Sequence, residues 1–395
     1  MQLVFLRLTL LFALVLLLML RKLDLTIVLL VANLISVILF GVSLREFLNI
    51  FYQTVVSWDT WRVIGIVFLS LIFSCLMASS SLLNLMEKEL VKIKKRRYAV
   101  LLAPVIIGLV PMPGGALLSA PLVEIQLKKE NISEVTKTYI NYWFRHIWEF
   151  FWPLYPGLIL TSAISGIPIK TLMVYLFPLT IISIFIGLFF LRDESRMITD
   201  ITNAERINHL QLLFSFLPIA LITILIIVGI DAFIALLLTT LILIFIIIYK
   251  KRRITLKGFS AKILLIVFLI FLFKEIFIKS VSFPEIDKLE TIFIILIATT
   301  IPFLTGFATG INQAYVGLSL PLIMSIIPLV HKLFYILIFY IAGYMGVLLS
   351  PVHFCLLLTK EYFNADSRAV YKKLIPSVLL VGLIGLVWVF LMTRF

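Results

Sequence analysis

Two segments of this 395-residue chain place helix-breaking and small polar residues inside apolar sequence. The first is Pro111-Met-Pro-Gly-Gly115, followed by Ser119, and the second is 305–313, followed by Ser319. Proline removes a backbone donor and glycine destabilises a helix, so both segments predict interrupted helices. Inside a bilayer, interrupted backbone persists only where protein surrounds it or where it lines a wet cavity. We interpret the two segments as the two halves of one binding site.

The residue types at each interruption favour different ligands. A Gly-Gly pair lets the backbone approach a ligand, and a half-helix beginning after it would point its N-terminal amides at an anion. At the second interruption, hydroxyl and amide oxygens suit Na⁺, while amide donors suit a polar or anionic solute. The alternatives are a packing kink at the first segment and polar residues that join helices at the second. The predicted substrate-binding residues are Pro113, Gly114, Gly115, Ser119, Thr309, Gly310, Asn312 and Gln313, and the predicted ion-coupling residues include Thr305 and Ser319.

Ionisable residues also occur inside predicted spans. Arg145, His146 and Glu149 lie at helical spacing, and Ser350 and His353 flank a proline. Ionisable groups in a span are candidates for function, and a histidine changes charge near physiological pH, so we add these five residues to the ion-coupling set. The alternatives are an anchor at the membrane interface, because tryptophans surround the first group, and a packing histidine for the second.

The sequence contains no nucleophile elbow, phosphate-binding loop or metal-ligand spacing. Cys75 and Cys355 are too isolated to predict a disulfide framework or a metal site. We therefore expect no catalytic residues, no bound metal, no cofactor and no enzyme. A membrane-embedded enzyme is kept as an alternative hypothesis. With no nucleotide site, transport would use an ion gradient, with Na⁺ and H⁺ both open as the coupling ion.

The composition indicates a polytopic membrane protein. Apolar residues make up 62% of the chain and charged residues 14%, with a mean hydropathy of +1.17, whereas soluble domains are about half apolar and about a quarter charged. The net charge of +14 is explained by Lys and Arg in cytoplasmic loops, so we expect lipid rather than nucleic acid as a partner. We predict spans near 3–20 (a retained helix, not a signal peptide), 25–41, 61–83, 139–164, 171–191, 211–229, 231–249, 261–278, 333–358 and 371–393.

Loop charge predicts the orientation. Basic loops occur at 88–97, 128–137, 250–253 and 360–373, while the alternate loops, such as 41–60, are poorer in Lys and Arg. All basic loops are cytoplasmic, with the N-terminus outside, if 99–127 and 290–329 are re-entrant hairpins that return to the side they left. We predict a multi-pass protein of the cell membrane on this basis.

The two halves of the chain resemble each other. Leu118-Ser-Ala-Pro-Leu122 aligns with Leu318-Ser-Leu-Pro-Leu322, and Pro153 aligns with Pro351 at nearly the same offset. The predicted fold is all-α, with two inverted repeats, about ten transmembrane helices and two re-entrant hairpins. The predicted domains are an extra N-terminal helix (1–24), repeat 1 (25–191), a cytoplasmic linker with an extra helix (192–230) and repeat 2 (231–395). Paired interruptions in inverted repeats point to a transporter site near the midplane.

Four motifs carry a family resemblance: Pro111-Met-Pro-Gly-Gly-Ala116, Trp143-Phe-Arg-His-Ile-Trp-Glu149, Trp152-Pro-Leu-Tyr-Pro-Gly157 and Leu349-Ser-Pro-Val-His353. With them the chain resembles the ion transporter superfamily of secondary carriers, and most closely a branch known only as a domain of unknown function. The resemblance implies hairpin tips that bind substrate and coupling ions, elevator-like movement and a homodimer. The first hypothesis is an ion-coupled secondary active transporter of a small polar or anionic solute. The second is a channel or lipid translocase of the same architecture.

Overall fold

The computed structural model describes residues 2–21, 23–80, 82–112, 114–128, 130–195, 198, 206–250, 253–256, 259–280 and 291–393. It is 82% helix, and these residues contain no strand. The first half of the chain forms α1 (Gln2–Leu20), α2 (Leu25–Leu39), α3 (Leu44–Val56), α4 (Trp58–Ser79), α5 (Leu82–Val91), α6 (Arg96–Gly108), α7 (Ala116–Leu127), α8 (Glu134–His146), the 3-10 helix η1 (Ile147–Phe150), α9 (Pro156–Ser165), α10 (Ile169–Phe190) and α11 (Arg192–Ser195). The second half forms α12 (His209–Val228), α13 (Ala232–Tyr249), α14 (Lys262–Ser280), α15 (Thr291–Thr309), α16 (Asn312–Met324), α17 (Lys332–Leu349), α18 (Phe354–Phe363) and α19 (Ser367–Thr393).

Several helices are long and apolar enough to cross a membrane. Among the described residues there are seven such segments: α4, α10, α12, α13, α15, α19 and the segment Lys332–Phe363, which contains α17 and α18. The helical, membrane-spanning character predicted from composition is thus supported, although this count is lower than the ten spans expected. One reason is that α2 has 15 residues, fewer than the roughly 20 that a span needs.

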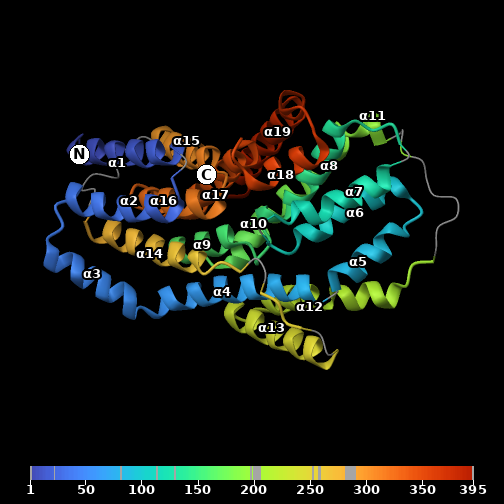
Figure 1. Ribbon diagram of the computed structural model, residues 1–395. Helices are drawn as coiled ribbons and strands as arrows, with labels where there is room; N and C mark the ends of the chain where they lie inside the picture. The colour runs from blue at the N-terminus through green and yellow to red at the C-terminus, as the bar shows by residue number, and fades with distance from the viewer. Residues whose placement is uncertain are drawn as a thin grey trace.

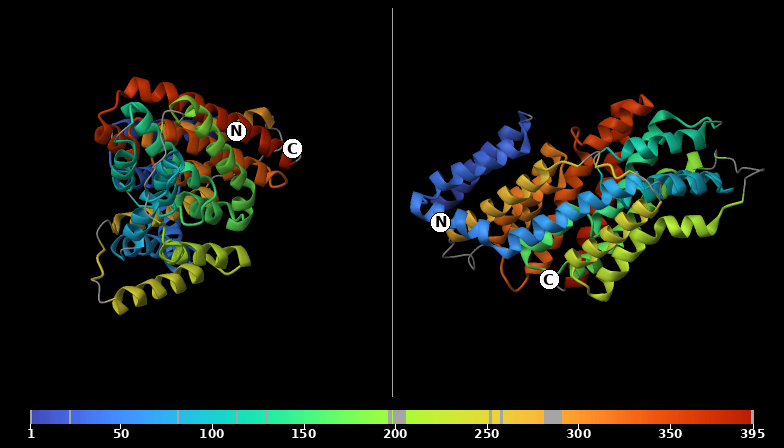
Figure 2. Two further views of the ribbon diagram at one scale, coloured as in Figure 1. Left: turned by 90° about the vertical axis from the view of Figure 1, so that its right-hand side faces the viewer. Right: turned by 60° about the horizontal axis from the view of Figure 1, so that its bottom comes forward.

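The helices form an elongated bundle in which most run along the long axis (Figure 1). In that view α6 and α7 lie toward one end of the bundle, and α15 and α16 lie toward the other. α17 is the most buried of the span-length segments and contacts α15, α16 and α19. α12 and α13 pack against each other and against α5 and α4, respectively, and Figure 2 shows this pair set off from the rest of the bundle.

Two predicted spans contain interruptions. The expectation of one continuous helix over 139–164 is wrong, and 333–358 lies in the span-length segment Lys332–Phe363 but is broken within it. In the first, α8 and η1 are followed by non-helical backbone at 151–155 before α9 begins. In the second, α17 ends at Leu349 and non-helical backbone at 350–353 precedes α18. Pro153 and Pro351, which lack the backbone N–H that a helix interior requires, lie in these interruptions. Proline alone does not set them, because Pro104 and Pro302 lie inside helices.

The segment 41–60, expected to be a loop, contains α3 and the start of α4. Ser43 and Glu46 form a capping box that starts α3, with each side chain bonded to the other's backbone N–H. This helix has 13 residues, fewer than the roughly 20 that a span needs. In the sequence, the capping residues Ser43 and Glu46 indicate this helix, and hydropathy does not.

Both interruptions predicted from Pro and Gly are present. The first lies at 109–115, between α6 and α7, and the second at 310–311, between α15 and α16. Gly114 and Gly310 have φ angles of +72° and +65°, which glycine adopts without the steric cost of a side chain. We call 109–115 the first tip, 310–311 the second tip, and the tips together with 151–155 and 350–353 the four breaks. Pro113, 199–205 of the predicted linker and 281–290 before α15 lie outside the described residues.

Candidate functional site

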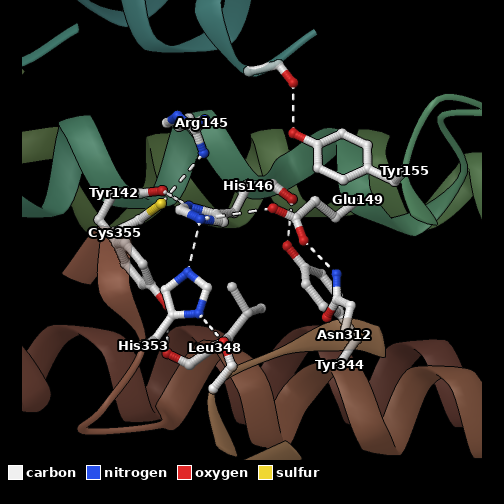
Figure 3. Close-up of polar contacts among 12 residues, drawn as sticks. Tyr142, Arg145, His146, Glu149, Tyr155, Asn312, Tyr344, Leu348, His353 and Cys355 are labelled. Carbon is white, nitrogen blue, oxygen red and sulfur yellow. Dashed lines mark hydrogen bonds and ion pairs between the residues drawn. The ribbon is translucent and has the colours of Figure 1, made fainter. Parts of the chain in front are cut away.

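The four breaks meet around a cavity of about 440 Å³. Met112 and Gly114 line it from the first tip, Gly310 and Ile311 from the second, and Tyr155 and Val352 from the other two breaks. The end of α8, η1 and the starts of α16 and α18 add charged and polar side chains: Arg145, His146, Glu149, Asn312, Gln313, His353 and Cys355. Figure 3 shows most of these side chains converging from two sides of the cavity.

A carboxylate and an amide join the two halves of the chain at this cavity. Asn312 Nδ2 donates to Glu149 Oε2 at 2.5 Å, and both side chains are buried. Gly157 makes the approach possible, because a Cβ there would lie 2.9 Å from the Cβ of Asn312. Asn312 Oδ1 is buried without a hydrogen-bond partner, which leaves this acceptor unused.

Two histidines face each other beside this pair. The Nε2 atoms of His146 and His353 are 3.1 Å apart, and the rings meet edge to face with centroids 5.0 Å apart (Figure 3). His146 Nδ1 lies 2.6 Å from the carbonyl of Tyr142, and His353 Nδ1 lies 2.7 Å from the carbonyl of Gly310. A carbonyl only accepts, so each Nδ1 must carry a proton and donate it. Each neutral ring therefore presents its Nε2 lone pair to the other ring.

Arg145 spans the first tip and the start of α18. Its Nη2 donates to the carbonyl of Met112 at 3.0 Å, and its Nη1 donates to Cys355 Sγ at 3.6 Å. A Cβ at position 115 would collide with Arg145 Nη2, so Gly115 is needed where the guanidinium crosses the tip. Arg145 Nε is buried without a partner. The side chain is 2% exposed, so the cation is held inside the protein rather than at a surface.

Tyrosine hydroxyls bond to main-chain carbonyls around the site. Tyr344 donates to the carbonyl of His146 at 2.5 Å, and Tyr340 donates to that of Glu149 at 2.6 Å. Tyr155 donates to the carbonyl of Gly108 at the end of α6. Where a helix stops, its last carbonyls lose their partners within the helix. These hydroxyls replace those partners and fix the backbone that carries the ionisable side chains.

The structure brings together most of the predicted site residues. Those that line the cavity are Gly114, Arg145, His146, Glu149, Thr309, Gly310, Asn312, Gln313 and His353. Gly115 does not line it but packs against Arg145. Arg145, His146 and Glu149 are buried, an arrangement unlike the interfacial anchor considered as an alternative.

Four further predicted residues do not line the cavity. Thr305 Oγ1 and Ser319 Oγ are 3.1 Å apart and join α15 to α16, as in the helix-joining alternative. Ser119 Oγ donates to the carbonyl of Ala116 within α7. Ser350 Oγ accepts from the backbone N–H of Val352 and stabilises the turn before His353. Pro113, also predicted, lies outside the described residues.

A protein-family model matches residues 5–393 of this chain, and its description reads "Protein of unknown function (DUF401)". The chain belongs to the DUF401 family. The matched region includes all four breaks and every residue named above that lines the cavity. A search of curated proteins finds no match.

The site of this DUF401 protein also contains residues that sequence reasoning missed. Cys355 was set aside because no metal-ligand spacing surrounds it, yet its Sγ and the nearest ligand atoms of His146 and His353 all lie within 4.8 Å of one another. Asp24 and Lys262 form an ion pair that lines the cavity. The only local signal was that Cys355 follows His353 by two residues, because the other partners come from distant segments.

Proposed function

We propose that this DUF401 protein is an ion-coupled secondary active transporter of a small polar or anionic solute that binds between the two tips. The supporting observation is the cavity, where four breaks in apolar helices converge on buried polar side chains. A dry core would fill such a space with apolar side chains. Discontinuous helices at a central site are the usual means by which transporters bind substrates and ions.

The chemistry of the cavity favours a solute that both accepts and donates hydrogen bonds. Arg145 and Asn312 both line it, and Arg145 Nε and Asn312 Oδ1 are buried without partners. An unpartnered buried polar group costs about 1–3 kcal/mol. A carboxylate or another acceptor would satisfy the guanidinium, while a hydroxyl, an amine or Na⁺ would satisfy the amide oxygen. We expect such a solute to carry both kinds of group.

The proposal includes the architecture of a carrier. The helices that flank the first tip, α6 and α7, lie toward one end of the bundle, and those that flank the second tip, α15 and α16, lie toward the other (Figure 1). Inverted repeats with re-entrant hairpins would place them in this way. On this proposal the protein belongs to the ion transporter superfamily, forms a homodimer and moves its site by an elevator-type mechanism. It lies in the cell membrane with basic loops in the cytoplasm.

The substrate class is identified first by ligand-induced stabilisation. Purified protein in detergent is heated with mono-, di- and tricarboxylates and amino acids, each with and without NaCl at constant ionic strength. A ligand that binds only the folded state raises the apparent unfolding temperature. A radiolabelled form of the strongest hit is then offered to proteoliposomes under an imposed Na⁺ or proton gradient.

We expect gradient-driven accumulation that Gly115→Val and Asn312→Ala abolish. Gly115→Val would displace Arg145, and Asn312→Ala removes the amide that contacts Glu149. The matched control is Asn49→Ala, which truncates an exposed asparagine on α3 and should leave accumulation unchanged. Full accumulation in both the Gly115→Val and the Asn312→Ala variant would refute the site. Flux that only equilibrates the solute, without dependence on either gradient, would favour a channel instead.

A further inference from the structure

We propose that His146, His353 and Cys355 form a binding site for a borderline or soft transition-metal ion of the Zn²⁺ class. The three nearest ligand atoms all lie within 4.8 Å of one another. At a tetrahedral zinc centre, bonds of about 2.1 Å to nitrogen and about 2.3 Å to sulfur separate neighbouring ligands by roughly 3.3–3.6 Å. Small side-chain rotations would bring the three ligands to these separations.

The histidines are oriented as metal ligands. Each ring donates its Nδ1 proton to a backbone carbonyl, that of Tyr142 or of Gly310. Metal-bound histidines almost always make such a bond through the nitrogen that does not bind the metal, because it fixes the tautomer and the ring plane. Here both bonds are made by buried rings, and both Nε2 atoms point at the same space.

The facing Nε2 atoms need something between them. In the neutral rings two lone pairs meet at 3.1 Å, an arrangement with no hydrogen bond to stabilise it. A shared proton would relieve this repulsion, and so would a metal ion. Cys355 favours the metal ion, because its sulfur lies close to both rings and is a strong ligand for soft metals.

The neighbouring charges of Arg145 and Glu149 suit a thiolate ligand and a bound cation, respectively. Arg145 Nη1 is placed to donate to Cys355 Sγ, as hydrogen-bond donors commonly do around metal-bound sulfur. Glu149 Oε1 lies 3.7 Å from His146 Nε2 and supplies negative charge beside the ion. A His₂Cys set disfavours Na⁺, Mg²⁺ and Ca²⁺, which prefer oxygen ligands.

An access route and a free position complete the site. All three ligands line the cavity, which extends to Asp24 and Lys262, whose side chains are 39% and 51% exposed. The three residues leave the fourth tetrahedral position to the cavity, as in zinc sites that exchange a water or substrate. The inference does not rest on transport, because it concerns equilibrium binding by the protein in detergent.

The test uses Co²⁺ as a spectroscopic probe. The purified protein is stripped with a chelator and titrated with CoCl₂. We expect visible ligand-field bands and a near-ultraviolet band from sulfur-to-cobalt charge transfer, both lost when one equivalent of ZnCl₂ is added. Cys355→Ser should abolish the charge-transfer band, and His353→Gln should weaken Co²⁺ binding at least about 10–100-fold, the effect seen even for residues around metal ligands.

The chain provides matched controls. Cys75→Ser removes the other buried cysteine, and His209→Gln removes an exposed histidine on α12. Both should bind Co²⁺ as the unaltered protein does, and size-exclusion profiles in detergent verify that all four variants are folded. A missing charge-transfer band in the unaltered protein, or a band that survives Cys355→Ser, would overturn the proposal. If only Cys75→Ser lost the charge-transfer band, the sulfur ligand would be Cys75 and not Cys355, and the proposal would be overturned as well.

Discussion

Gly310→Ala tests how closely the second tip approaches the break that carries His353. Gly310 has a φ of +65°, and a Cβ built there would lie 2.7 Å from His353 Cα and 3.0 Å from Ser350 Oγ. Left-handed backbone costs an L-residue about 1–2 kcal/mol. Forcing a methyl group into packed atoms costs a further 1–3 kcal/mol, roughly. We therefore expect Gly310→Ala to lower the free energy of unfolding by about 2–5 kcal/mol.

Gly41 provides the matched control. Its φ is +68°, and a Cβ there would have no neighbour within 4 Å. Gly41→Ala should therefore cost only the free energy of placing an L-residue in left-handed backbone, about 1–2 kcal/mol. The difference between the two variants isolates the contact between the second tip and the residues before α18, which we expect to be about 1–3 kcal/mol.

The assay is equilibrium unfolding in mixed micelles, in which SDS is titrated against a non-ionic detergent and tryptophan fluorescence is followed. Both variants are measured beside the unaltered protein at the same lipid and detergent concentrations. Equal losses for Gly310→Ala and Gly41→Ala would refute the reasoning, because they would mean that the tip and the 350–353 break do not touch. A larger loss for Gly41→Ala would refute it as well.

Three further predictions concern the polar contacts of the site and its edge. Asn312→Asp replaces the donor to Glu149 with a second buried carboxylate, so we expect a loss of at least about 1–3 kcal/mol in the same unfolding assay; unchanged stability would show that the pair is not in contact. Tyr344→Phe leaves a buried carbonyl of α8 without its donor and should cost about 1–3 kcal/mol, which a destabilisation below the error of the assay would contradict. The hydrogen bond from Lys262 holds the pKa of the Asp24 carboxyl below its usual range in the folded protein. The ion pair therefore stabilises the fold at pH values above the pKa of Asp24 in the unfolded chain, and this stabilisation is lost as the pH falls through the pKa of Asp24 in the folded protein. Lys262→Gln should therefore lower the unfolding temperature at pH 7 more than at pH 3, and equal shifts at both pH values would count against the ion pair.

The breaks that could be predicted from sequence were those with a dense local signal. Prolines and adjacent glycines near residue 113, and glycines and polar residues at 305–313, interrupt apolar sequence strongly enough to be recognised. The breaks at 151–155 and 350–353 also contain proline. They were placed inside predicted spans because hydropathy averaged over some 20 residues is insensitive to a four- or five-residue interruption. A proline with bulky apolar neighbours carries little weight in such an average.

The grouping of side chains in the cavity was only partly predictable. Arg145, His146 and Glu149 share a local spacing, so their proximity follows from helix geometry. The approach of His146 to His353 joins residues 207 apart, and no local pattern encodes that distance. Packing of α8 against α18 decides the actual contact.

The four breaks and the polar side chains depend on each other. A helix that stops inside an apolar bundle exposes carbonyls that lipid cannot satisfy. Here the carbonyl of Met112 accepts from Arg145, and that of Gly310 accepts from His353. These two donors are thus side chains that line the cavity, and their orientation is set by the backbone they satisfy. Closing either break into a continuous helix would remove the carbonyl that holds the side chain, so the site requires interrupted helices and not merely polar residues at these positions.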